Sequence, residues 1–346
     1  MLILGEVHTG LLQNSTAVSP LTCVRALSLL VGDRVARWER PIAHAASPRL
    51  LTGLDCRMPS RSGARSRAVG TAASRAMITG GHVLQGSTYL RVVAGTTSRR
   101  LPWSYYLSRP GTVETIGRLD QHDLAHGFVA TEGSAAALDL GAISGRVMDS
   151  VQGSAGLDRR PPIRMTRTWL RWVATSTDPD SEPESSVRFT IDNDRIRTVW
   201  LRAHPEPTGP TTPNGPAGLT GLPRASSSPS LASPPGWPRL AEVAEDLALH
   251  DWLLTTLLRV IERSQIGAGS GSRSVERLRP AIDHLLHLWM PAARLDQPLA
   301  ALWESLEQRP GFSRQWNASV ARIRDHVAVN TLALLGAGAH DDTSQA

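Results

Sequence analysis

PPIRMTRTWLRWVATS (residues 161–176) and VRFTIDNDRIRTVWLRA (residues 187–203) decide the fold class. Both stretches are rich in the β-branched and aromatic residues that favour strands, and Asp192-Asn193-Asp194 marks a turn inside the second. Three consecutive strands joined by turns predict an antiparallel meander. Because helical patterns occur elsewhere in the chain, we expect an α+β protein whose N-terminal, sheet-rich domain is mostly antiparallel and carries a few helices.

The rest of the N-terminal half mixes strand and helix signals. Ser19 can cap a helix, and Pro20 suits its first position, so a helix is predicted that ends before Gly32. Gly80-Gly81 predicts a turn between two strands. Further strands are predicted in residues 2–7, 68–95, 111–119 and 141–151.

Residues 205–238 are dominated by Pro, Gly, Ser and Thr and cannot bury enough apolar surface to fold. We predict that this flexible linker separates the sheet-rich domain (residues 1–204) from a small four-helix bundle (residues 239–337), and lets the two parts move apart. Residues 338–346 are predicted as a disordered tail. The helices of the bundle are predicted at residues 238–264, 274–290, 297–308 and 312–336.

All 37 basic residues are arginine, and the chain has no lysine. Typical P-loop NTPases need a lysine on the phosphates and pyridoxal enzymes need a lysine amine, so both classes are excluded. Residues 1–100 hold thirteen arginines and four acidic residues, a net charge of +9. Since arginine attracts phosphates and carboxylates alike, this charge predicts an anionic partner such as nucleic acid.

The sequence predicts a cytoplasmic protein with no membrane partner. The two cysteines, Cys23 and Cys56, suit a reducing compartment. No apolar stretch approaches the roughly 18–20 residues of a membrane span. Glu6 interrupts the apolar N-terminus, which argues against a signal peptide.

Glu6 and His8 are two residues apart at the end of a predicted strand, so their side chains would share a face. Their Cα atoms would lie roughly 6–7 Å apart, which permits an acid–base pair or two metal ligands. The alternative is the solvent-facing end of a strand whose residues 2–5 are buried. We favour this alternative, because the spacing is common by chance.

The segment LDQHDLAHG places four polar groups within seven residues. In a helix, two of its histidines would stack at positions i and i+4. The alternative is an exposed loop or short helix without a ligand. Together with the first pair, this segment gives a candidate polar site made of Glu6, His8, Asp120, His122 and His126.

His284 and His287 lie one turn apart on a predicted helix. Such a pair can bind a metal, but a zinc site usually needs a third ligand nearby. A polar stripe beside the apolar face of the helix is the favoured interpretation. We therefore assign no metal site and no cofactor.

Arginines gather in a Gly- and Ser-rich segment without acidic residues beside them, which makes this segment the better candidate for binding nucleic acid or another anion. Nine arginines also accompany three tryptophans in residues 159–202, a combination that suits a single-strand nucleic-acid platform. Acidic turns beside these strands favour a solvated sheet face instead. The arginines of the first segment are Arg57, Arg61, Arg65 and Arg67.

Two common catalytic signatures are missing from the sequence. No G-x-S-x-G elbow occurs, and no G-x-G-x-x-G lies between a predicted strand and helix. Nucleophilic hydrolases of that type and Rossmann enzymes are therefore disfavoured, and no catalytic residue is assigned.

Several runs resemble a family of uncharacterised actinobacterial proteins: GEVHTGLLQNS, PIAHAASPRLLTGLDC, MITGGHVLQGS, LPWSYYLSRPG, HDWLLTTLLRVIERS and RPAIDHLLHLWMP. Members of this family are usually encoded beside a variant P-loop protein and a methyltransferase-like protein. The resemblance implies a multi-component system with this chain as a non-catalytic part, and it supplies no catalytic residues.

Three functions remain as hypotheses. The first is a non-catalytic interaction or adaptor protein, whose partners are products of neighbouring genes. The second is nucleic-acid binding by the arginines of the N-terminal domain. The third is an enzyme of unrecognised type with a Glu/His site. We favour the first, because the two predicted domains differ in charge balance and no catalytic constellation is convincing.

Overall fold

The computed structural model describes residues 2–62, 66–95, 97, 99–117, 120–130, 138–176, 186–203, 237–264, 266, 271–295 and 297–343. Its strands are β1 (Leu2–Leu11), β2 (Ala36–Trp38), β3 (His44–Ala46), β4 (Leu50–Arg57), β5 (Arg67–Thr79), β6 (Val83–Ala94), β7 (Thr112–Ile116), β8 (Thr168–Ser176), β9 (Ser186–Ile191) and β10 (Ile196–Ala203). Its helices are α1 (Pro20–Leu27), α2 (Trp103–Leu107), α3 (Gln121–Ala130), α4 (Leu140–Gln152), α5 (Trp237–Ser264), α6 (Gly271–His284), the 3-10 turn η1 (Leu286–Leu288), α7 (Gln297–Gln308) and α8 (Phe312–Thr343).

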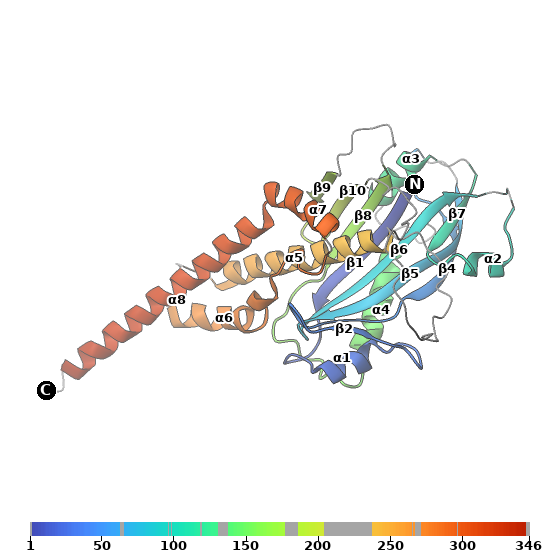
Figure 1. Ribbon diagram of the computed structural model, residues 1–346. Coiled ribbons are helices and arrows are strands. Elements are labelled where there is room, and N and C mark those ends of the chain that lie inside the picture. The colour runs from blue at the N-terminus through green and yellow to red at the C-terminus, as the bar shows by residue number, and fades with distance from the viewer. Residues whose placement is uncertain are drawn as a thin grey trace, which may run out of the picture.

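The strands form one mixed sheet in the order β2-β3-β5-β7-β6-β1-β8-β10-β9, with β4 also paired to β5 (Figure 1). Among the pairings of the described residues, only β6–β7 and β8–β10 are parallel. This confirms the predicted α+β class with a mostly antiparallel sheet.

Local signals in the sequence predicted two connections well. The Ser19 hydroxyl accepts a hydrogen bond from the Thr22 backbone N–H and so caps α1. Gly80 and Gly81 have φ angles of +59° and +68° in the turn between β5 and β6. Both values lie in the left-handed region that glycine adopts without strain.

Strand β1 lies in the middle of the sheet, and all ten of its residues are buried. Ile3 and Val7 point to one face and join a core with α5, whereas Leu2 and Leu4 point to the other and pack with α3 and α4. The expectation that this strand ends near Glu6 in solvent is therefore wrong. Layers of helices on both faces explain the burial.

Residues 141–151 form part of α4 instead of the predicted strand. Ile143, Val147 and Val151 recur at helical spacing and are buried on one side of the helix. The Asp139 carboxylate accepts from the Ala142 N–H and caps the start. The β-branched residues of this segment led to the strand prediction. The Asp139 cap and the helical spacing of the buried residues favour a helix instead.

The predicted meander of the last three strands is also wrong. β10 lies between β8 and β9, parallel to β8 and antiparallel to β9. Consecutive strands are therefore not all neighbours. The acidic segment 177–185 that leads from β8 toward β9 lies outside the described residues.

The C-terminal helices share a core with the sheet. α5 crosses the face of the sheet opposite α4 and packs on β1, β6 and β8 (Figure 1). Val7 of β1, Trp172 of β8 and Leu247 of α5 belong to one buried cluster, which continues into α6, α7 and α8. The expectation that the linker alone joins two separable parts is therefore wrong. Residues 204–236, nearly all of the predicted linker, lie outside the described residues.

The helices of the predicted bundle are present with two changes of length. α6 ends at His284 and is followed by η1, whereas one helix was predicted through Met290. α8 continues past Gly336 and through most of the predicted tail to Thr343. No helix in the described part of the chain is long and apolar enough to cross a membrane.

Candidate functional site

The structure brings Glu6 and His8 together on the face of the sheet that α4 covers. His8 Nε2 donates to Glu6 Oε1 over 2.9 Å, and Arg171 Nε of the neighbouring strand donates to Glu6 Oε2 over 3.3 Å. Glu6 is 5% exposed and His8 is 9% exposed. The Glu6 carboxylate is thus a buried charge compensated by two basic side chains.

Helix α4 is fitted closely over this pair. Ser144 Oγ donates to the Glu6 backbone carbonyl over 3.0 Å. A Cβ added at Gly141 would overlap the Glu6 carboxylate, whereas one at Gly145 would lie 3.8 Å from His8 Nδ1. The Glu6 backbone thus ties α4 to the sheet through Ser144, and the Glu6 carboxylate explains why glycine stands at the second position of this helix.

Gly141→Ala should therefore lower the free energy of unfolding by about 1–3 kcal/mol, because the added methyl group displaces the Glu6 carboxylate. Gly145→Ala on the same helix is the matched control. It leaves an ordinary van der Waals contact and gains helix propensity, so its effect should lie between about 0 and +1 kcal/mol of added stability. Urea unfolding followed by circular dichroism measures both, and equal effects would contradict this account.

The other predicted polar residues lie on α3. Asp120 Oδ1 accepts from the backbone N–H groups of His122 and Asp123 and so caps the helix. His122 Nε2 and His126 Nε2 are 3.1 Å apart, as the i, i+4 spacing predicted, and the His126 ring packs on Trp200 of β10. Burial, followed by the charges of His122 and nearby arginines, lowers the pKa of His126. These residues form a separate cluster from Glu6 and His8, which lie under α4.

Acidic side chains do oppose the arginine-rich segment. Arg67 donates through Nε and Nη2 to the two carboxylate oxygens of Asp55, over 2.6 and 2.9 Å. The hydrogen bond from Arg67 lowers the pKa of Asp55. Ser60 and Ser62 donate to the Asp123 carboxylate of α3.

Arg57 and Arg61 are exposed, and Arg65 lies outside the described residues. Anion binding by these arginines stays a prediction. Asp55 offsets the charge of Arg67, so the segment offers an anion less positive charge than its sequence suggested.

The tryptophans of residues 159–202 do not form an open stacking platform. Trp172 is fully buried under α5, and Trp169 and Trp200 are half-buried under the helices of the other face. Arg197 is 3% exposed and binds Asp251 of α5. Helices cover both faces of β8 and β10, so the bases of a nucleic acid would have to displace them to stack on these tryptophans.

The sequence interpretation missed a row of buried polar side chains along α5. Glu245 binds Arg75 of β5, Asp246 binds Arg294, and Asp251 binds Arg197 of β10. Burial, opposed by Arg197, raises the pKa of Asp251 to about 6. Acidic residues within the apolar stripe of this helix indicated that buried basic partners exist. The sequence could not identify these arginines, because they lie in distant segments.

His250 of the same helix is also buried. Its Nδ1 donates to the Asp246 carbonyl over 2.7 Å, and its Nε2 accepts from the Met290 N–H over 3.3 Å. Burial lowers the pKa of His250, which keeps the ring neutral. The Nε2 atom therefore ties α5 to the segment after η1, whereas Nδ1 is bonded within α5 itself.

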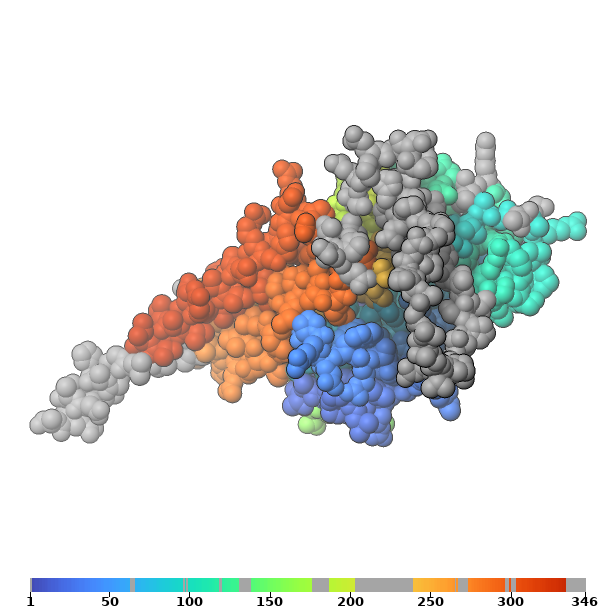
Figure 2. Space-filling model, in the orientation of Figure 1, coloured from blue at the N-terminus to red at the C-terminus, as the bar shows by residue number. Residues whose placement is uncertain are grey.

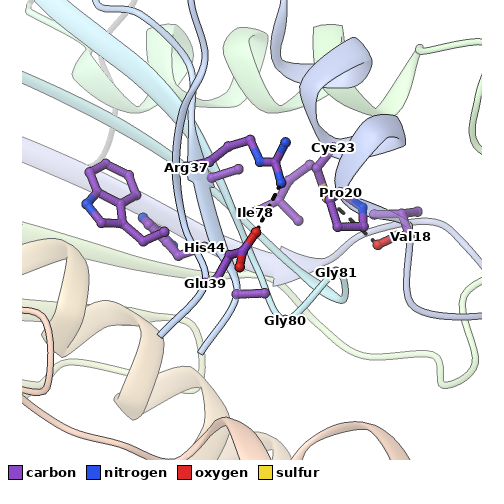
Figure 3. Close-up of a pocket in the computed structure, with 12 residues that line it drawn as sticks. Val18, Pro20, Cys23, Arg37, Glu39, His44, Ile78, Gly80 and Gly81 are labelled. Atoms are coloured by element: carbon purple, nitrogen blue, oxygen red, sulfur yellow. Dashed lines mark hydrogen bonds and ion pairs between the residues drawn. The ribbon is translucent and has the colours of Figure 1, made fainter. Parts of the chain in front are cut away.

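A small cavity lies between α1 and the β2–β3 hairpin (Figure 3). Its volume is about 110 Å³, below the roughly 300–1,000 Å³ of common small-molecule sites. Arg37 and Glu39 form an ion pair at its side, 3.6 Å apart. Burial raises the pKa of the Cys23 thiol in its wall to about 11, so this cysteine is protonated at neutral pH and is a poor nucleophile.

Three histidines meet where the β5–β6 turn contacts the C-terminal helices. His82 Nε2 lies 3.3 Å from His284 Nδ1, and the His82 ring centre is 6.5 Å from that of His287. His82 is 5% exposed, and His287 is exposed. The sequence offered the H-x-x-H spacing but could not show that the turn brings a third imidazole to it.

Comparisons with protein-family models, with curated proteins and with solved structures found no match to this chain.

Proposed function

We propose that this protein is a non-catalytic interaction component of a multi-protein bacterial system in the cytoplasm, and that the end of α8 binds its partner. The observation that carries the proposal is the exposure of apolar side chains where α8 leaves the rest of the molecule. Val329 is 65% exposed and Leu332 is 69% exposed. Figures 1 and 2 show α8, in red, extending beyond the other elements.

The packing of α8 divides it into two parts. Phe312, Trp316 and Ile323 are buried against α5, α6 and α7, and Val327 still packs on the edge of that core. We call residues 328–343 the α8 extension. At about 1.5 Å per residue, it adds roughly 24 Å to the helix.

The sequence of the extension is unusual for a solvated helix. Residues 327–339 read VAVNTLALLGAGA and contain no charged residue. A helix that is apolar on most sides is normally buried, and an amphipathic or apolar helix commonly binds by lying in a groove of another protein. This composition supports a protein partner, because a nucleic acid would favour basic side chains there.

Co-purification with the products of the neighbouring genes tests the proposal. Val329→Glu with Leu332→Glu should weaken capture of the partner by about 100-fold or more, since two buried carboxylates replace apolar contacts. Asn317→Glu with Ala318→Glu is the matched control, because it adds the same charges at exposed positions in the packed part of α8. The control should bind like the unmodified protein.

Three results would overturn the proposal. One is equal capture by both double variants. Another is no capture of any neighbouring product by the unmodified chain. The third is self-association through the extension in light scattering, which would make its occupant a second copy of this chain.

A further inference from the structure

We propose that His82, His284 and His287 form a zinc site that ties the β5–β6 turn to the C-terminal helices. Imidazole nitrogens are common ligands of Zn²⁺, and three of them with one open position make a frequent coordination set. The proposal does not depend on the function of the α8 extension.

The distance between the first two nitrogens fits a shared metal ion. Zn–N bonds of about 2.0–2.1 Å at a tetrahedral angle place two ligand nitrogens roughly 3.3–3.4 Å apart. His82 Nε2 and His284 Nδ1 are 3.3 Å apart, with ring centres separated by 4.7 Å at an angle of 64°. The two nitrogens come from different elements and are hydrogen-bonded to each other, so a shared metal ion would take the place of the proton between them.

His287 supplies the third nitrogen by rotation of its side chain. As the structure stands, no three His, Cys, Asp or Glu side chains among the described residues are arranged to hold a metal ion. His287 lies on η1, three residues after His284, and is exposed, so its ring can turn toward His82 without disturbing the core. Burial, followed by the charges of His284 and His287, lowers the pKa of His82 to about 4.

The backbone around His82 is held firmly in place. The His82 carbonyl accepts from the Leu12 N–H over 2.7 Å, and the His82 N–H donates to Thr79 O over 3.1 Å. Gly80 lies so close to Leu288 that a Cβ there would overlap its side chain. This contact fixes the turn against η1 and so sets the spacing of the three rings.

The protonation states suit a metal ligand set at neutral pH. Burial, with the charge of His284, also lowers the pKa of His287. Neutral imidazoles bind the metal without first losing a proton.

Zinc titration of the chelator-treated full-length protein tests the site. One Zn²⁺ should bind per chain, and Co²⁺ should give the visible absorption of a tetrahedral complex. His82→Gln and His284→Asn should each weaken zinc binding by roughly 100-fold or more, because even second-shell changes cost about 10–100-fold. His287→Gln should weaken it by at least about 10-fold.

The matched control is the double variant His122→Gln with His126→Gln. This pair has a similar nitrogen spacing, 3.1 Å, but both rings belong to one helix and no zinc site is proposed there. The control should bind zinc like the unmodified protein, and zinc should raise the melting temperature of both. His284→Asn keeps a polar group near Nδ1, so its metal-free melting temperature checks that it folds.

The proposal fails if the unmodified protein binds no zinc at micromolar concentration. It also fails if His82→Gln and His284→Asn bind zinc normally while remaining folded, or if the His122/His126 variant abolishes binding.

Discussion

Replacing Arg75 by methionine is expected to lower the free energy of unfolding by about 3–5 kcal/mol. Arg75 Nε donates to Glu245 Oε1 over 3.0 Å, and Arg75 Nη2 donates to Glu245 Oε2. Glu245 is 2% exposed on α5. Without the guanidinium, its carboxylate becomes a buried charge without its bidentate partner, and that desolvation cost is the source of the loss.

The charges around Arg75 show that this pair favours its ionised form. Burial works to lower the pKa of Arg75, but the charge and hydrogen bonds of Glu245, assisted by Glu242, outweigh burial and raise that pKa. Because the pKa of Arg75 is raised in the folded protein, its charged form contributes stability at every pH below the usual arginine pKa, which includes neutral pH.

Two further variants distinguish the loss of the Arg75–Glu245 ion pair from a nonspecific effect of the substitution on stability. Arg75→Met with Glu245→Leu removes both charges and should recover most of the stability, because a buried ion pair replaced by apolar side chains is often neutral. Arg279→Ala breaks the exposed Arg279–Asp283 pair of α6 and should cost less than about 1 kcal/mol. Urea unfolding at pH 7.5 measures all three variants.

A double variant as unstable as Arg75→Met alone would contradict the assigned role of the pair.

The sequence predicted what depends on local chemistry. The Ser19–Pro20 start of α1 and the Gly80-Gly81 turn were predicted because capping and positive φ are properties of a few adjacent residues. The alternation of side chains along a strand likewise predicted that Glu6 and His8 lie on one face of β1.

The sequence could not show which helices pack on each face of the sheet, because these helices come from distant parts of the chain. Whether Glu6 meets water or protein depends on α4, which follows more than 130 residues later and approaches through Gly141. The same limit applies to α5, whose Glu245 and Asp251 have arginine partners on β5 and β10. His82 and His284 are separated by about 200 residues, and only the contact between the turn and η1 brings them together.

Trp172→Ala should be the other strongly destabilising change, with a loss of about 3–5 kcal/mol. Trp172 is fully buried between the sheet and α5, within the cluster that joins the two parts of the chain. Its indole Nε1 has no hydrogen-bond partner, so the loss comes from apolar contacts and the cavity left behind. Trp169→Ala, on the same strand but half-buried against His8 on the other face, should cost clearly less.

Gly5 makes the role of the Trp172 ring testable by a double-mutant cycle. Gly5 pairs with Trp172 across β1 and β8, and a Cβ at Gly5 would overlap the indole ring. Gly5→Ala alone should cost about 1–3 kcal/mol. In the Trp172→Ala background, the same change should cost much less, because the methyl group enters the vacated space. Additive losses would mean that the ring does not lie over Gly5, and the burial of β1 beneath α5 would need another explanation.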